Sequence, residues 1–143
     1  LRFIEFMDVG NSNNWDLNQV MTKDQILETI NTNYNFELIG RKSKSDVAER
    51  WVEKTSGQII ELISSISEPF CSNCTRARLS SEGKLFTCLF GFQGFDLKEI
   101  LRNGGDLSGK IKHIWEQRDD RFSELRTEYT TTKQKIEMSY IGG

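Results

Sequence analysis

The sequence has no apolar run near the ~20 residues that a membrane-spanning helix needs. Its formal net charge of -2 gives no general attraction to nucleic acid or anionic lipid, so any anion must be bound by locally placed arginines. We therefore expect no nucleic-acid partner and no membrane association. The start at Leu1, without an initiator methionine or a signal-peptide pattern, predicts a cut inside a longer protein.

Few residues of three types are present: the 143 residues include only three cysteines, one histidine and one proline. An odd number of cysteines argues against a disulfide framework, and without a secretory signal we expect a reducing compartment. The content of 36% hydrophobic and 28% charged residues is typical of a soluble globular protein. The length suits one domain with its own core, or the end of a larger fold.

Local patterns predict mixed α/β structure. Thr22 and Gln25 have capping-box spacing, which predicts a helix over 23–32 with an apolar face. Segment 47–51 fits a strand or a helical turn equally well. The predicted strands, in chain order, are 2–7, 36–39 (ended by Gly40) and 57–67, and the predicted loops are 8–15 and 41–46.

The second half predicts a hairpin and two helices. Segments 77–80 and 84–87 flank a turn with Gly83, which is a hairpin signal. Asp96 can cap a helix that ends near 103–105. Asp106 begins a second helix with apolar residues at Ile111, Ile114 and Trp115. From Arg118 onward the chain is polar, and we expect it to be loose by itself.

The three cysteines form the pattern Cys71-x2-Cys74-x13-Cys88, and the hairpin would return the third to the first two. Three thiolates can hold three irons of a four-iron cluster and leave one iron open to a substrate. A structural zinc site needs four ligands, and His113 is the only histidine available for it. The spacing leaves zinc and iron–sulfur equally open, with unliganded thiols as a third interpretation.

Arg76 and Arg78 follow the second cysteine at strand spacing, which predicts side chains on one face. Each guanidinium can bind phosphate or carboxylate oxygens through two hydrogen bonds. Without the cysteines the pair would be read as two surface arginines. Beside a metal site, a role in binding an anionic ligand becomes equally reasonable.

Several motifs in order resemble the molybdenum cofactor biosynthesis protein A family, the radical SAM GTP 3',8-cyclases. The resemblance spans nearly the whole chain. Its most specific parts are 2–10 (RFIEFMDVG), Asn14-Trp15, Pro69-Phe70-Cys71-x2-Cys74-x-Arg76-x-Arg78-Leu79, Gly83-Lys84-Leu85, Cys88-Leu89-Phe90 and Ile141-Gly142-Gly143.

The resemblance implies an α/β (α+β) fragment of a larger enzyme, because the N-terminal CxxxCxxC motif of the family is missing. Residues 1–66 would be the last strand or strands of an incomplete TIM-type barrel with a covering segment. Residues 67–143 would be the auxiliary-cluster domain, with the hairpin, the helices and the C-terminal tail.

The resemblance also implies site residues. Cys71, Cys74 and Cys88 would bind an auxiliary 4Fe-4S cluster whose open iron contacts the guanine of GTP. GTP would also be held by Arg76, Ala77, Arg78 and, at the triphosphate, Arg2. Met7 would line the S-adenosylmethionine pocket. Gly142 and Gly143 would reach into the active site, where residues without side chains fit a narrow cavity.

The implied function is the conversion of GTP to 3',8-cyclo-GTP, the first step of molybdenum cofactor biosynthesis. S-adenosylmethionine and a second 4Fe-4S cluster would belong to the missing part, so the isolated chain would be inactive. Cyclic pyranopterin monophosphate synthase would act downstream, and a homodimer of the full-length enzyme stays open. The location would be the cytoplasm, or the mitochondrial matrix in a eukaryote, with the cytoplasm preferred.

Two other functions remain open from the residues. One is a zinc module that recognises a phosphate-bearing partner through Arg76 and Arg78. The other is the auxiliary-cluster domain of a different radical SAM enzyme.

Overall fold

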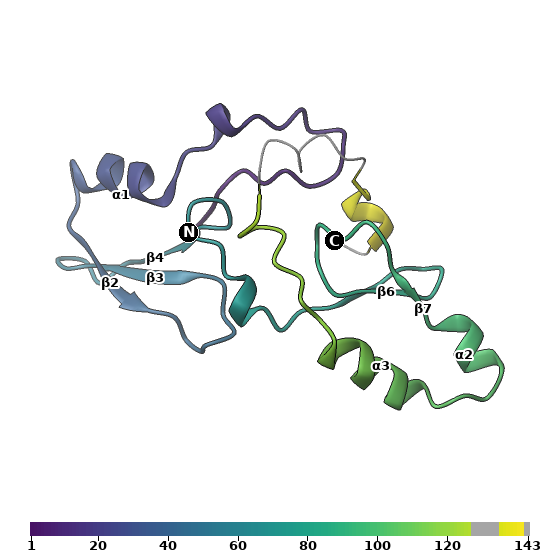
Figure 1. Ribbon diagram of the computed structural model, residues 1–143. Helices are drawn as coiled ribbons and strands as arrows, with labels where there is room; N and C mark the ends of the chain where they lie inside the picture. Colours follow the sequence, from purple (N-terminus) through teal and green to yellow (C-terminus); the bar gives the residue numbers. More distant parts are fainter. Residues whose placement is uncertain (127–134, 142–143) are drawn as a thin grey trace. The chain divides into compact units, whose positions relative to one another are not determined.

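The computed structural model describes residues 1–126 and 135–141, and the chain divides into two compact units (Figure 1). The first unit contains Leu1–Met7 and Trp15–Cys74. The second contains Asp8–Asn14 and the chain from Thr75 onward. The structure is mixed α/β, as predicted.

The first unit is built on a four-stranded sheet with the order β1-β4-β3-β2. Strand β1 runs parallel to β4, and the other neighbours are antiparallel. The strands are β1 (Arg2–Ile4), β2 (Phe36–Gly40), β3 (Glu49–Glu53) and β4 (Ile59–Ile63). The ambiguous segment 47–51 thus contributes to a strand.

Helix α1 (Lys23–Asn31) begins at the predicted capping box. The main-chain N–H of Thr22 donates to the Gln25 side chain at 2.9 Å, and the N–H of Gln25 donates to the Thr22 hydroxyl at 3.4 Å. These two bonds satisfy N–H groups that a helix start leaves without partners. The helix packs on the sheet: Ile26 and Leu27 of α1 form a core cluster with Leu62 of β4, and Phe3, Ile30 and Trp51 pack against it.

Two strands are shorter than the apolar patterns predicted. Strand β1 stops at Ile4, and the expectation that it would be buried is wrong. It lies at the edge of the sheet, where Ile4 is 53% exposed. Strand β4 stops at Ile63. The N–H groups of Ile66 and Ser67 donate to the Glu5 carboxylate instead of continuing a sheet.

The second unit contains a three-stranded antiparallel sheet with the order β5-β6-β7. Strands β5 (Arg78–Leu79) and β6 (Lys84–Phe86) form the predicted hairpin. Gly83 has a φ of +82°, a conformation that glycine adopts without strain. The third strand, β7 (Phe95–Asp96), had no sequence signal.

Both predicted helices of the second unit are present. Helix α2 (Lys98–Arg102) follows Asp96, whose carboxylate accepts from the N–H of Lys98 at 2.9 Å. Helix α3 (Leu107–Glu116) is capped by Asp106, which accepts from the N–H of Gly109 at 2.8 Å. The core of this unit contains Leu85, Leu97 and Ile114, with Leu107 packed against them.

The chain from Arg118 onward was expected to be loose by itself, and residues 118–126 contain no helix or strand. Contacts with distant residues nevertheless hold this stretch in place. Phe122 stacks on Phe90 with ring centroids 5.0 Å apart, and the Arg126 side chain is 9% exposed. Farther on, the short 3-10 helix η3 (Met138–Ile141) ends in the buried Ile141. Aromatic and ionic contacts with distant residues order these segments, which lack an apolar periodicity of their own.

Candidate functional site

Cys71 and Cys74 lie on one tight turn of the first unit, the 3-10 helix η2 (Cys71–Asn73). The N–H of Cys74 donates to the carbonyl of Cys71 at 3.2 Å and closes the turn. Neither cysteine is in a disulfide, and both are partly exposed. A closed turn with two accessible thiols is a suitable start for a metal site, since thiolates are the ligands that zinc and iron–sulfur clusters share.

Cys88 lies in the second unit, just after β6; it too is partly exposed and is not in a disulfide. Its carbonyl accepts from the N–H of Gly91 at 3.2 Å, which makes a turn. The buried Phe90 anchors that turn by stacking on Phe122, and the Arg126 guanidinium lies 5.3 Å from the Phe90 ring centroid.

The three cysteines are divided between the units: Cys71 and Cys74 belong to the first and Cys88 to the second, and each unit is described by itself. Within residues 1–126 and 135–141, no group of three or more His, Cys, Asp or Glu side chains is placed to hold a metal ion. The donor chemistry nevertheless fits a cluster with three protein ligands, since all three thiols are free of disulfides. His113, the other candidate zinc ligand, is exposed on α3.

The arginine segment links the C-x2-C turn to the hairpin. Arg76 and Ala77 are exposed and precede the sheet, whereas Arg78 is partly buried and begins β5. The strand therefore starts at the second arginine, and regular strand pairing does not include the first. Arg78 is paired with Phe86 across the hairpin.

Arg2 forms an ion pair within the sheet of the first unit. Its Nε donates to the Glu61 carboxylate at 2.7 Å, from the neighbouring position on β4. This hydrogen bond, followed by the attraction of the guanidinium charge, lowers the pKa of Glu61. The Arg2 side chain is still 55% exposed, so a phosphate could reach it.

Met7 is the last residue of its stretch of the first unit and is partly buried. The preceding carbonyl, that of Phe6, accepts from Trp15 Nε1 at 2.6 Å. Gly142 and Gly143 lie outside the described residues. The residue before them, Ile141, is 1% exposed.

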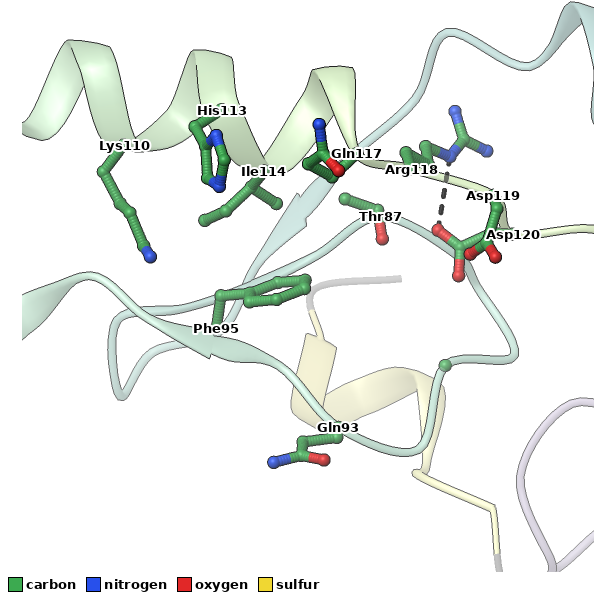
Figure 2. Close-up of a pocket in the computed structure, with 11 residues that line it drawn as sticks. Thr87, Gln93, Phe95, Lys110, His113, Ile114, Gln117, Arg118, Asp119 and Asp120 are labelled. Atoms are coloured by element: carbon green, nitrogen blue, oxygen red, sulfur yellow. Dashed lines mark hydrogen bonds and ion pairs between the residues drawn. The ribbon is translucent and has the colours of Figure 1, made fainter.

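A pocket of about 250 Å³ lies in the second unit, beside the Cys88 turn (Figure 2). Lys110, His113 and Ile114 extend into it from α3, toward Phe95. Arg118 lines it too and is paired with Asp120 at 3.3 Å. Its lining includes the candidate zinc ligand His113 but none of the cysteines or arginines predicted from the sequence as site residues: it consists of Thr87, Gly91, Gln93, Phe95, Lys110, His113, Ile114, Gln117, Arg118, Asp119 and Asp120.

Sequence reasoning missed one charged cluster, in the second unit. Asp8 is fully buried and is paired with Arg126 at 2.8 Å and with Lys135 at 3.1 Å. Asp8 had been assigned to a loop, and the two cations lie in the stretch that was expected to be loose. No local pattern could have revealed a contact between residues 118 and 127 positions apart.

Two comparisons with known proteins, one with family models and one with individual relatives, point to the same group of proteins. The family model described as Molybdenum Cofactor Synthesis C matches residues 1–124. A protein named GTP 3',8-cyclase from Staphylococcus saprophyticus is 47% identical over the whole chain, and proteins of that name from Staphylococcus carnosus and Staphylococcus epidermidis are 46% identical. The chain spans 44% of the length of each of these relatives.

In the described part of the chain, no helix has the length and the apolar character needed to cross a membrane. The family model covers most of the chain, including all three cysteines and both arginines of the Arg76–Arg78 segment. The relatives named above are similar along its entire length. The chain therefore belongs to the Molybdenum Cofactor Synthesis C family.

Proposed function

We propose that the chain is the GTP- and cluster-binding C-terminal part of a GTP 3',8-cyclase, which converts GTP to 3',8-cyclo-GTP in molybdenum cofactor biosynthesis. The observation that carries this proposal is the 47% identity, over the whole chain, to a protein of that name. The part that generates the radical, with S-adenosylmethionine and another 4Fe-4S cluster, would lie outside this chain. The enzyme would act in the bacterial cytoplasm, and cyclic pyranopterin monophosphate synthase would use its product.

Cys71, Cys74 and Cys88 would hold the auxiliary 4Fe-4S cluster. The support from the structure is that none of the three cysteines is in a disulfide and that each is partly exposed and lies on a turn. When bound, the cluster would supply an iron without a protein ligand, to which the base of GTP can bind. The proposed functional division is between residues 66 and 67, so that the cluster region includes all three cysteines.

The arginines would bind the charged and polar groups of GTP. Arg76 and Ala77 are exposed next to Cys74, where a ligand can reach the guanidinium and the main chain. Arg78 would act from the start of β5. Holding the ribose close to the radical source is a proximity effect, worth ~7–11 kcal/mol in favourable cases.

Arg2 would hold the triphosphate by exchanging its Glu61 partner for phosphate oxygens. An exposed ion pair contributes little to stability, so this exchange is energetically accessible. Met7 would line the S-adenosylmethionine pocket. The parallel pair β1–β4 supports the assignment of residues 1–66 to the end of a TIM-type barrel, where neighbouring strands are parallel.

The test is anaerobic reconstitution of the 143-residue chain, followed by analysis of iron, sulfide and zinc. About four irons and four sulfides per chain are expected, as for one four-iron cluster. One zinc without sulfide would contradict the proposal and favour a zinc module. Cys88→Ser should lose the cluster, and Ser72→Ala, in the same turn as Cys71, is the matched control that should retain it.

GTP binding to the reconstituted chain separates this enzyme from other radical SAM enzymes with an auxiliary cluster. Replacing both Arg76 and Arg78 by Ala should weaken GTP binding by at least about 100-fold, because charge-assisted hydrogen bonds to phosphate or base are lost from two guanidiniums. Arg102→Ala, on the exposed helix α2, is the control and should bind GTP normally. Equal binding by the double variant would refute the assignment of the two arginines.

A further inference from the structure

The loop Asp8–Ser12 contacts the segment Lys135–Ile141 through a set of polar interactions, although more than 120 residues separate them in the sequence. Both belong to the second unit. The loop reaches that unit as part of a seven-residue stretch between two stretches of the first unit. The contacts include the side chain and the main chain of Lys135 and the side chain of Glu137.

Asn11 binds the main chain of Lys135 in the way that a neighbouring strand would. Its Nδ2 donates to the Lys135 carbonyl at 2.5 Å, and its Oδ1 accepts from the Lys135 N–H at 2.9 Å. One planar amide thus satisfies both main-chain groups of a single residue. Two bonds in opposite directions set the orientation of the segment as well as its position.

Glu137 is held by the same loop. Its carboxylate accepts from the main-chain N–H of Asn11 at 2.7 Å and from the Asn11 side chain at 3.3 Å. Gly10 provides the room for this carboxylate, since a Cβ there would lie 2.2 Å from Glu137 Oε2. Gly10 also has a φ of +68°, which disfavours other residues.

Asp8 anchors the loop and the segment electrostatically. Its carboxylate, which is 0% exposed, pairs with Arg126 at 2.8 Å and with Lys135 at 3.1 Å. Lys135 Nζ also donates to the Asp8 carbonyl at 2.6 Å. The two cations are nearly buried, so water screens these contacts weakly.

The far end of the segment is held by the hairpin. The Tyr140 hydroxyl donates to the Glu82 carboxylate in the β5–β6 turn, and its ring packs edge-on against Phe86. Ile141 is 1% exposed. The segment is therefore attached along its length, from Lys135 to the residue before Gly142.

We propose that the loop Asp8–Ser12 is a docking clamp for the segment Lys135–Ile141, with Asp8, Gly10 and Asn11 as its positioning residues. The clamp fixes the point from which Gly142 and Gly143 continue. Asp8 is bonded directly to Met7, so the residue proposed to contact S-adenosylmethionine is covalently joined to the clamp. The effect on catalysis rests on the proposed function, whereas the docking itself does not.

The first test is hydrogen exchange of the 143-residue chain carrying Asn11→Ala. Amides in Lys135–Ile141 should exchange at least about tenfold faster, because both side-chain bonds to the Lys135 main chain and the side-chain bond to Glu137 are lost. Amides of Leu85 and Ile114, in the core of the same unit, should keep their rates. Unchanged exchange in 135–141, or equal acceleration throughout the unit, would overturn the clamp.

A rescue pair separates docking from general stability. Asn11→Asp places a second carboxylate beside Glu137, so exchange in 135–141 should accelerate. Adding Glu137→Gln removes the charge repulsion but does not restore a donor for the Lys135 carbonyl, so exchange in 135–141 should recover only in part. Exchange in 135–141 that stays as slow in Asn11→Asp as in the unmodified chain would contradict the contact. Ser12→Ala is the graded control, because it removes only a 3.5 Å contact and should change the rate less than about twofold.

The second test uses the full-length enzyme with Asn11→Ala. GTP affinity of the reconstituted enzyme should be retained, while the turnover number for 3',8-cyclo-GTP falls about tenfold or more. Unchanged turnover would refute the positioning role of the clamp, and so would a joint loss of GTP binding. Absence of product from the unmodified enzyme would instead refute the proposed function, so the two failures are distinguishable.

Discussion

The two units of the chain each bury a carboxylate, and they satisfy it in different ways. Glu5 of the first unit is 3% exposed and Asp8 of the second is 0% exposed. The oxygens of Glu5 accept from the main-chain N–H groups of Lys23, Ile66 and Ser67, each at 2.8 Å. These donors are neutral, and the backbone of α1 and of the turn after β4 holds them in place.

The Asp8 carboxylate instead forms ion pairs with the side chains of Arg126 and Lys135. Long side chains have more conformational freedom than a main chain, and both cations come from distant parts of the sequence. The difference shows that the first unit is stabilised by its own sheet and turns. The second unit, whose strands have two or three residues, depends on the docking of remote segments.

The largest effect is expected for Asp8→Ala, which removes the carboxylate that two buried cations share. Loss of one partner from a buried ion pair costs about 3–5 kcal/mol. The free energy of unfolding should fall by that amount in the second unit, measured by hydrogen exchange in Leu85 and Ile114. The sheet of the first unit should be unaffected. A loss below about 1 kcal/mol would show that the cations find other partners at little cost.

A smaller loss is expected for Glu5→Gln in the first unit. The amide retains one acceptor oxygen but replaces the other with a donor that faces main-chain N–H groups. We expect a loss of about 1–3 kcal/mol, measured by hydrogen exchange in strands β1 and β4. Glu28→Gln, on the exposed side of α1, is the control and should change little. If the second unit were affected as strongly as the first, the comparison between the units would not hold.

Glu53 gives the first unit a pH dependence. Hydrogen bonds from the Ser56 N–H and then the Ser56 hydroxyl lower the pKa of this carboxyl from 4.5 to about 2. Because the folded pKa lies below the unfolded one, the stabilisation is complete above pH 4.5 and is lost as the pH falls toward about 2.

Acid unfolding of Glu53→Gln should therefore show a flatter pH dependence of unit-one stability in that range. The measurement is urea unfolding at successive pH values, compared with the unmodified chain. An equally steep dependence in the variant would mean that other carboxyls account for it.

The smallest effect is expected for Glu61→Gln on the sheet of the first unit. It weakens the ion pair that competes with phosphate for Arg2, so GTP affinity of the full-length enzyme should rise roughly two- to fivefold. Glu37→Gln, at another exposed ion pair of the same sheet, is the control. Weaker GTP binding by Glu61→Gln would argue that Glu61 orients Arg2 rather than competing for it.

Features set by neighbouring residues were predictable from the sequence. The capping box of Thr22 and Gln25, the hairpin turn with Gly83 and the cap at Asp106 are all present. Each depends on bonds between residues a few positions apart, so a local pattern contains the necessary information. The family was predictable for a related reason, since its motifs are short runs in a fixed order.

Features set by distant contacts were not predictable. The Phe90–Phe122 stack and the ion pairs of Asp8 join segments whose own patterns suggested loops. Strand β1 showed the opposite error, because an apolar run at a sheet edge leaves Ile4 exposed. For the site, none of the three cysteines is in a disulfide, and their joint ligation of a cluster remains a proposal.

The excursion of Asp8–Asn14 into the second unit has a consequence for inheritance. A gene fragment that began at Thr75 would encode every strand of the second sheet, yet it would lack Asp8 and Asn11. Recombination between related genes near Cys74 would likewise pair a loop from one parent with a terminal segment from the other. Changes in the loop and in Lys135–Ile141 are therefore expected to be inherited together, although more than 120 residues separate them in the sequence.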